Sequence, residues 1–225
     1  ILNGLLLATF LLLGKPSPLL WLLSAFVLAA WLFDFYRIYP YLPFKKKTVE
    51  KSQNLDLTIL TANIRTKNRK YDLLMELVKR KDPDMVLLIE VDEKWVKNIS
   101  SLIEKYPHRI IKPMENTYGL VLLSKKSMER EQILFRVDDD VPSIKTVIKD
   151  PKWGKVEFYG LHPRPPRPSE AHSTQRDAEL MQVADEISKT TRPCLVLGDL
   201  NDVAWSHTTR LFLRTSGLLD PRHGR

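Results

Sequence analysis

Hydrophobic residues are distributed along this chain in two different ways. Up to about residue 36 they are almost continuous, whereas from residue 55 onwards they alternate with polar residues or recur at helical spacing. A continuous apolar run suits a lipid environment, and a periodic one suits a folded domain with one face in water. The pattern therefore predicts a transmembrane region over residues 1–38, a polar linker over residues 39–54 and a folded domain over residues 55–225.

The transmembrane region consists of two apolar runs, separated by a short segment that contains two prolines. The run Leu19–Tyr36 is about long enough to span a bilayer and carries aromatic residues near its ends, while the run Ile1–Leu13 is shorter. We therefore expect N-terminal transmembrane helices, the first of them incomplete, in an integral membrane protein whose soluble part lies on an undetermined side. A buried helical hairpin is the alternative. No small-residue cleavage pattern follows Tyr36, which disfavours a signal peptide.

The domain begins as strand, helix, strand, helix and then changes to a series of short strands. The spacing of apolar residues predicts helices over 71–81, 93–105 and 174–189, with a last helix capped by Ser206. Strands are expected at 55–63, 85–89, 108–111, 120–123, 132–137, 144–148, 155–161 and 194–197. Helices mixed among two sets of strands predict an α/β sandwich in which two facing mixed sheets have helices outside.

Charge and cysteine content add little to this picture. The net charge of +8 is modest for 225 residues, and Lys45–Lys47 directly follows the second apolar run, where lysines typically meet anionic headgroups or fix topology. The single cysteine, Cys194, excludes a disulfide within the chain.

Candidate chemistry lies where strands end. Asn63, Glu90 and His162 each terminate a predicted strand, and Asp199 with Asn201 follows another. Groups at strand ends gather along one edge of a sheet, so residues far apart in the sequence can form one site. Each group alone has an ordinary structural explanation. Their regular placement is what favours a hydrolytic site.

Glu90 and His162 follow strands that are otherwise apolar. A carboxylate after Met85–Ile89 is either paired, bound to a metal or exposed at the exit of the strand. Magnesium takes few protein carboxylates and completes its shell with water and phosphate, so one glutamate suits it. His162 can move protons near neutral pH, although a histidine at a strand end is more often structural.

The segment Gly198–Asn201 has the sequence Gly-Asp-Leu-Asn. The glycine permits a tight turn, after which Asp199 and Asn201 face the same way. Asp199 can orient a water molecule or accept its proton, and Asn201 can donate to a phosphate oxygen without adding negative charge. The alternative is an Asx turn without catalytic purpose.

Together these residues resemble the endonuclease/exonuclease/phosphatase superfamily, which includes deoxyribonuclease I-like nucleases, abasic-site endonucleases, inositol phosphatases and neutral sphingomyelinases. The resemblance covers residues 55–225. It rests on Thr61-Ala62-Asn63, Ile89-Glu90-Val91, Tyr118-Gly119 through Leu123-Ser124, Leu161-His162-Pro163 and Gly198 to Asn201. The family implies a four-layered α/β sandwich, Mg²⁺ or Mn²⁺ as cofactor and in-line attack of water on phosphorus.

The resemblance also implies roles for individual residues. Glu90 and Asn63 are expected to hold the metal, while Asn63, His162, Asp199 and Asn201 are expected to be catalytic. The second acidic residue often found after the glutamate motif falls at Asp92 or Glu93. Nothing after Asn201 matches the family's final Ser-Asp-His motif, so we expect the domain to lack its C-terminal strand or strands here.

Substrate identity is left open by the sequence. The substrate is expected to be a phosphoester, either in nucleic acid or in a lipid or small diester, and a noncatalytic membrane-tethered module on the same fold is the alternative. The membrane is the expected partner, and no obligate protein partner is evident. Three arginines are candidates for contact with substrate phosphate: Arg164, Arg167 and Arg176.

Overall fold

The computed structural model describes residues 17–50, 57–166 and 170–224. The first predicted apolar run and Arg167 lie outside the described residues. The chain divides into two compact units, one of Ser52–Leu218 and the other of Ile1–Lys51 together with Leu219–Arg225.

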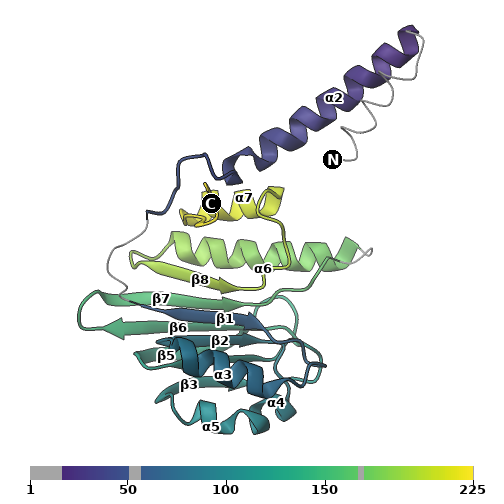
Figure 1. Cartoon of the computed structure of the whole chain (residues 1–225). Helices are drawn as coiled ribbons and strands as arrows, with labels where there is room; N and C mark the ends of the chain where they lie inside the picture. Colours follow the sequence, from purple (N-terminus) through teal and green to yellow (C-terminus); the bar gives the residue numbers. More distant parts are fainter. Residues whose placement is uncertain (1–16, 51–56, 167–169, 225) are drawn as a thin grey trace. The chain divides into compact units, whose positions relative to one another are not determined.

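The larger unit contains two mixed four-stranded sheets (Figure 1). Their strand orders are β1-β2-β4-β3 and β5-β6-β7-β8. β1 runs parallel to β2 and β7 parallel to β8, while all other neighbours are antiparallel. The strands are β1 (Ile59–Asn63), β2 (Met85–Ile89), β3 (His108–Lys112), β4 (Leu120–Ser124), β5 (Ser127–Phe135), β6 (Pro142–Asp150), β7 (Gly154–Leu161) and β8 (Cys194–Gly198).

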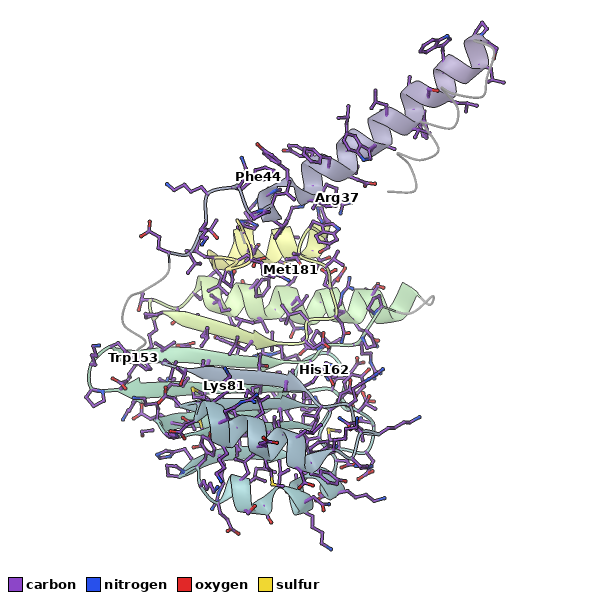
Figure 2. All side chains as sticks on the ribbon, viewed as in Figure 1. Arg37, Phe44, Lys81, Trp153, His162 and Met181 are labelled. Carbon is purple, nitrogen blue, oxygen red and sulfur yellow. The ribbon has the colours of Figure 1, made fainter. Side chains whose placement is uncertain are left out.

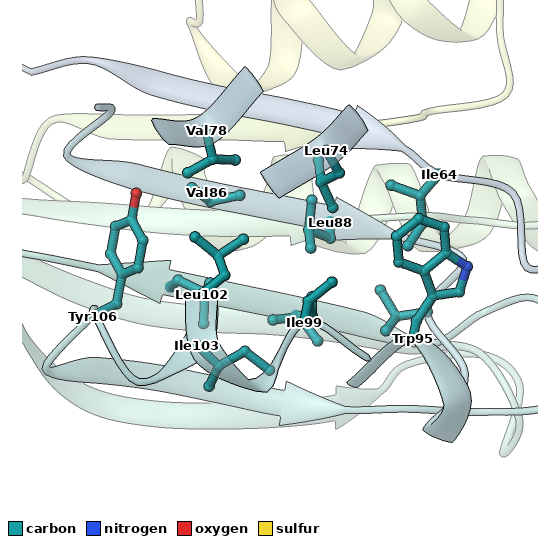
Figure 3. Packing of buried hydrophobic residues seen from close by; sticks show 13 residues of the cluster. Ile64, Leu74, Val78, Val86, Leu88, Trp95, Ile99, Leu102, Ile103 and Tyr106 are labelled. Atoms are coloured by element: carbon teal, nitrogen blue, oxygen red, sulfur yellow. The ribbon is translucent and has the colours of Figure 1, made fainter. Parts of the chain in front are cut away.

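Alternation along the strands produces the layers. In β2, Val86 and Leu88 pack outward against α3, α4 and α5, as Figure 3 shows, whereas Met85, Leu87 and Ile89 face the second sheet. The far side of the second sheet packs against α6 and α7. The predicted fold class, a four-layered α/β sandwich, is therefore confirmed. The helices are α3 (Tyr71–Lys81), α4 (Glu93–Asn98), α5 (Ser100–Ile103), α6 (Glu170–Ser188) and α7 (His207–Ser216).

Two predicted elements differ from those observed. The helix expected over 93–105 is two short helices, because Ile99 leaves the helical region with φ −107° and ψ 17° while its side chain stays buried in the core. The strand expected over 132–137 is the longer β5, which begins at Ser127 and contains a bulge between Glu129 and Gln132. The spacing of hydrophobic residues does not predict either change, because buried side chains can still point into the core on both sides of a bulge or a helix break.

The smaller unit contains α2 (Pro18–Ile38) and a 3₁₀ turn at Tyr39–Tyr41. By length and composition α2 can cross a membrane or act as a signal sequence, since the segment Trp21–Tyr41 has a mean hydropathy of 1.4 and none of it is buried. Part of the predicted linker contacts the C-terminal segment. The Gly224 amide donates to the Pro40 carbonyl at 3.0 Å, and the Thr48 hydroxyl donates to the Asp220 carbonyl at 2.7 Å.

Candidate active site

Four strands place their carboxyl ends at the same end of the larger unit. β1 and β2 are parallel, as are β7 and β8, and these strands lead to Asn63, Glu90, His162 and Asp199. Figure 2 labels His162 at this end, opposite Trp153. We call it the catalytic end. The sequence predicted that these side chains gather at one edge, and the structure brings them together from both sheets.

Asn63 links the two sheets. Its side-chain nitrogen donates to Glu90 Oε1 at 2.8 Å and to Asp199 Oδ2 at 3.1 Å. Its side-chain oxygen accepts the backbone N–H of Arg65 at 3.1 Å, which fixes the orientation of the amide. The amino group therefore faces both carboxylates. In this arrangement Asn63 orients Glu90. The side-chain oxygen of Asn63 points away from the Glu90 carboxylate, although the two residues were expected to bind the metal together.

Glu90 lies in a conformationally constrained turn directly after β2. It is a non-glycine residue with φ +65°, a conformation that costs free energy unless neighbours hold it. The Thr66 hydroxyl donates to the Glu90 carbonyl at 2.9 Å, and the Thr66 N–H points to Glu90 Oε2 at 3.4 Å. On the other side the Val91 N–H donates to the Gly119 carbonyl at 3.0 Å. A Cβ at Gly119 would lie 1.9 Å from the Val91 oxygen, which explains the glycine of this motif.

The segment after β8 is a tight turn tied to the His162 loop. Gly198 has φ +147°, and a Cβ there would lie 1.8 Å from the Leu161 carbonyl oxygen, so only glycine fits. Asp199 Oδ1 accepts the Asn201 N–H at 3.2 Å, which is the Asx turn considered as the alternative. The Asn201 side chain donates to the Pro163 carbonyl at 2.9 Å. The turn thus leaves Asp199 Oδ2 directed at Asn63 and joins β8 to the residue after His162.

His162 is buried, with 4% of its surface exposed. Burial lowers its pKa below the usual value, against the opposing charges of Asp199 and Glu90, which raise it. The imidazole is therefore neutral around pH 7. Its ring lies 5.3 Å from the Tyr118 ring, and its Nδ1 has no hydrogen-bond partner among the residues that the structure describes.

The described arginines that were candidates for phosphate contact are already paired. Arg164 forms salt bridges with Asp138 at 2.7 Å and Asp140 at 2.5 Å. Arg176 is bonded to the Asn201 carbonyl at 3.0 Å and to Asp177 at 2.7 Å. Binding a substrate phosphate would require each side chain to break these contacts. Their role as phosphate ligands remains a prediction, and the geometry favours a supporting role around the site.

The comparisons with known proteins decide the family. The sequence profile of the Endonuclease/Exonuclease/phosphatase family matches residues 60–225. The chain belongs to this family. The resemblance predicted from the five motifs is thereby confirmed. No curated protein sequence matches the chain.

Several solved structures have a similar fold but share little sequence identity with this chain. A truncated TDP2 from Caenorhabditis elegans is 18% identical with a TM-score of 0.53, and the match covers 65% of this chain and 63% of the truncated chain. Beta toxin from Staphylococcus aureus, a mutant with bound magnesium ions, is 17% identical, with a TM-score of 0.59 and coverage of 74% and 72%. Sphingomyelinase C from Streptomyces griseocarneus is 16% identical, with a TM-score of 0.56 and coverage of 72% and 70%. At this identity the likeness shows the fold.

The acidic residues after Glu90 differ in their surroundings. Asp92 is fully buried, accepts the Trp95 N–H at 2.7 Å as the cap of α4, and pairs with Arg69 at 2.8 Å. Glu93 lies exposed in the first turn of α4. Because Asp92 is buried and its side chain bonds both Trp95 and Arg69, its role is to support the structure of the turn after Glu90. The helix cap was not recognised from the sequence, although Asp before a helix is its usual signal.

The site of this family member suits a hard divalent cation. Glu90 and Asp199 come within reach of a single amide, with no cation paired to either carboxylate among the described residues. Two adjacent anions without a compensating positive charge repel each other, and a bound cation would remove that repulsion. The described residues contain no cluster of three histidine, cysteine or acidic side chains that could hold a metal. Magnesium keeps most of its shell as water and substrate, so it needs few protein ligands.

Proposed function

We propose that this protein is a magnesium- or manganese-dependent phosphoester hydrolase that acts at a membrane surface. The observation that carries the proposal is the Asn63 amide, which joins Glu90 of one sheet to Asp199 of the other. Both carboxylates are also close enough to His162 to raise its pKa. Three groups suited to phosphoryl transfer to water thus share one end of the domain.

Each residue has a task in this mechanism. Asp199 orients the attacking water and accepts its proton as the new phosphorus–oxygen bond forms and the ester bond breaks. Neutral His162 donates a hydrogen bond to the phosphoryl oxygens as their charge grows. Asn63 fixes the Glu90 and Asp199 carboxylates, and the second N–H of Asn201 is available to a phosphate oxygen. A divalent cation held by Glu90, when bound, would polarise the phosphate and neutralise its charge.

The apolar helix α2 supports a membrane setting. Its side chains are mostly exposed, including Trp21, Phe26 and Phe33, and the segment is long enough to cross a bilayer. A protein that retains α2 should stay with membranes after carbonate extraction, and one that begins near Lys51 should not. Release of the longer protein by carbonate would remove the membrane from the proposal and leave the hydrolase unaffected.

Hydrolysis is tested with the full-length protein after treatment with a chelator. Bis(p-nitrophenyl) phosphate, an oligonucleotide, a phosphoinositide and sphingomyelin are offered with and without added Mg²⁺ or Mn²⁺, and Asp199→Asn is the control. We expect turnover of at least one phosphodiester that requires metal and is lost in the variant. No turnover and no calorimetric metal binding would instead support the noncatalytic, membrane-tethered module.

A further inference from the structure

Helix α6 buries a carboxyl group that has no cationic partner. Glu179 is 4% exposed, and its Oε1 has no hydrogen-bond partner among the residues that the structure describes. Two cations of the β5–β6 hairpin, Arg136 and Lys145, both bond instead to Glu186, two turns further along α6. Arg176, on the turn before Glu179, is also already paired. A buried carboxylate without a counter-charge is costly, so the protonated form of Glu179 is favoured.

One helical turn before Glu179, Gln175 has a second buried acceptor without a donor. The Gln175 side-chain nitrogen donates to Asp138 Oδ1 at 2.8 Å. This bond fixes the amide, because an amide turned the other way would set its oxygen against the carboxylate. The Gln175 Oε1 has no partner in the described part of the chain. Since residues four apart on a helix are neighbours, α6 holds two unsatisfied acceptors next to each other.

A single proton satisfies both acceptors. When Glu179 is protonated, its hydroxyl can donate to Gln175 Oε1. When Glu179 is ionised, its carboxylate repels that oxygen and attracts the nitrogen of the same amide. The protonation of Glu179 therefore decides which way the Gln175 amide is turned.

The surroundings of Glu179 place its titration near neutral pH. Burial, which has the largest effect, and the charge of Asp138 raise the Glu179 pKa to about 7, while Arg136 opposes them. Tyr159 of β7 and Cys194 of β8 pack in the same cluster as α6, and burial raises the pKa of each, so both stay neutral in this range. The titratable side chains of α7, which also packs on α6, are exposed: His207, Arg210 and Arg214.

The Gln175 amide begins a chain of contacts that leads to the candidate active site. Asp138, which accepts from Gln175, also pairs with Arg164 at 2.7 Å. The Arg164 guanidinium lies 5.4 Å from the centre of the Tyr118 ring, which is 5.3 Å from the His162 ring. Arg164 also follows His162 by two residues. Rotation of the amide would therefore deprive Asp138 of a donor and, through Arg164, loosen the loop that carries His162.

We propose that Glu179 is a positioning residue whose protonated carboxyl group holds the Gln175 amide and, through it, the loop that carries His162. The proposal rests on the proposed function, since this loop serves that site. Loss of the proton to solvent turns the amide and releases Asp138. Hydrolysis then weakens as pH rises through neutrality, although no group that touches the substrate has titrated.

The test compares Glu179→Gln with Glu179→Ala and with a matched control, Asp185→Asn. Glutamine keeps a donor at this position at every pH, and alanine removes it. Asp185 is an exposed acidic residue of the same helix that pairs with Lys189. Three quantities are measured on the full-length protein at pH 6 and pH 8: the infrared C=O band of protonated carboxyl groups, the NMR signal of the Arg164 Nε–H, and kcat/KM for bis(p-nitrophenyl) phosphate with Mg²⁺. Arg164→Lys identifies the NMR signal, and melting temperatures show that each variant is folded.

We expect the wild type at pH 6 to show a protonated-carboxyl band that is absent at pH 8 and absent from Glu179→Gln. The Arg164 signal should move between the two pH values in the wild type and in Asp185→Asn, and most of this movement should disappear in Glu179→Gln. Because His162 is present in all three proteins, its own titration cancels in the comparison.

The same comparison predicts the change in activity. Between pH 6 and pH 8, wild-type kcat/KM should fall about tenfold relative to Glu179→Gln, because a group with a pKa of about 7 is only about one-tenth protonated at pH 8. Asp185→Asn should follow the wild type. Glu179→Ala, which has no donor, should be impaired at both pH values relative to Glu179→Gln.

Two results would overturn the inference while leaving the proposed function intact. One is the same infrared band in the wild type and Glu179→Gln at pH 6, because Glu179 would then not carry the proton. The other is a parallel pH dependence of the Arg164 signal or of kcat/KM in these two proteins, because the proton would then not act on the loop. Absence of hydrolysis by the wild type overturns the proposed function, and the infrared and NMR comparisons still decide whether Glu179 positions the loop.

Discussion

Three carboxylates at one end of the larger unit have different partners from Glu90 and Asp199 at the other. At the end away from His162, several acidic side chains have lysine partners: Asp82 pairs with Lys125 at 2.7 Å and Asp150 with Lys126 at 2.6 Å. There Glu129 contacts both Lys149 and Lys155, and these lysines lower its pKa to about 2. At the catalytic end Glu90 and Asp199 share only the amide of Asn63. Asp82, Asp150 and Glu129 thus have cationic partners at what we call the lysine end, whereas Glu90 and Asp199 have none among the described residues.

This difference in charge pairing indicates the functional site better than the hollows in the protein surface do. A hollow of about 550 Å³ lies at the lysine end and is lined by Lys125, Lys126, Lys149, Asp150 and Lys155, among others. Each of its four lysines already forms an ion pair with a carboxylate, so a ligand would have to compete with these pairs. The candidate active site is a set of uncompensated groups, and we consider this stronger evidence than the volume of the hollow.

The largest expected effect tests whether the catalytic end performs chemistry. In the full-length protein, Asp199→Asn and His162→Ala should each lower kcat by about 10²- to 10⁴-fold with little change in melting temperature, because both groups act mainly in the transition state. Glu129→Gln, at the lysine end, is the matched control. A variant with near-normal turnover would show that its residue has no catalytic role.

The next effect concerns the missing positive charge. Glu90→Gln should weaken magnesium or manganese binding by roughly 100-fold in calorimetry, because it removes the carboxylate that Asn63 and Thr66 hold in place. Circular dichroism checks that the fold is intact. An unchanged titration would move the metal to another group, with Asp199 the first to be examined by the same method.

Glu179 in α6 is a buried carboxyl group, so its surroundings differ from those of the acidic residues at either end of the larger unit. Glu179 is 4% exposed, and burial raises its pKa to about 7, although Arg136 opposes the shift. A carboxyl group whose folded-state pKa is raised stabilises the fold at low pH, and this stability is lost as pH rises through about 7. Relative to Glu179→Gln, the wild type should therefore lose roughly 2 kcal/mol of unfolding free energy between pH 5 and pH 8. Parallel pH profiles from urea unfolding would show that the group is solvated or paired.

The smallest effect is expected at the lysine end. Glu129→Gln removes an exposed ion pair with two lysines, so it should change kcat/KM by less than about twofold and shift the melting temperature only slightly. Thermal unfolding and kinetics in the same buffer measure both. A loss of activity comparable to that of the Asp199 variant would erase the distinction between the two ends.

Much of the domain could be predicted from the sequence, because burial has a simple periodic signature. The five residues of β2 are all buried, and their alternating contacts with helices on one side and strands on the other form the layers that were expected. The residues at the strand ends were predicted for the same reason. Parallel strands bring their carboxyl ends to one edge whatever the loops between them do.

Specific partners could not be predicted, because they depend on distances between segments remote in sequence. The salt bridges of Arg164 to Asp138 and Asp140 join residues 26 and 24 positions apart. The role of Thr66 depends on the left-handed backbone of Glu90, which no residue preference signals. The family resemblance identified motifs and gave no indication of these contacts.

The hydrogen bond between Asn63 and Asp199 joins residues 136 positions apart. A contact of this sequence separation closes a long loop, so it forms only after both sheets and the crossover helix between β7 and β8 have assembled. During synthesis, β1 leaves the ribosome long before β8, which belongs to the other sheet, can pack against it. In a refolding experiment, the moment at which metal affinity appears would therefore mark the last step of folding. A second sheet that fails to assemble would give a protein with native-like helices and no hydrolytic centre.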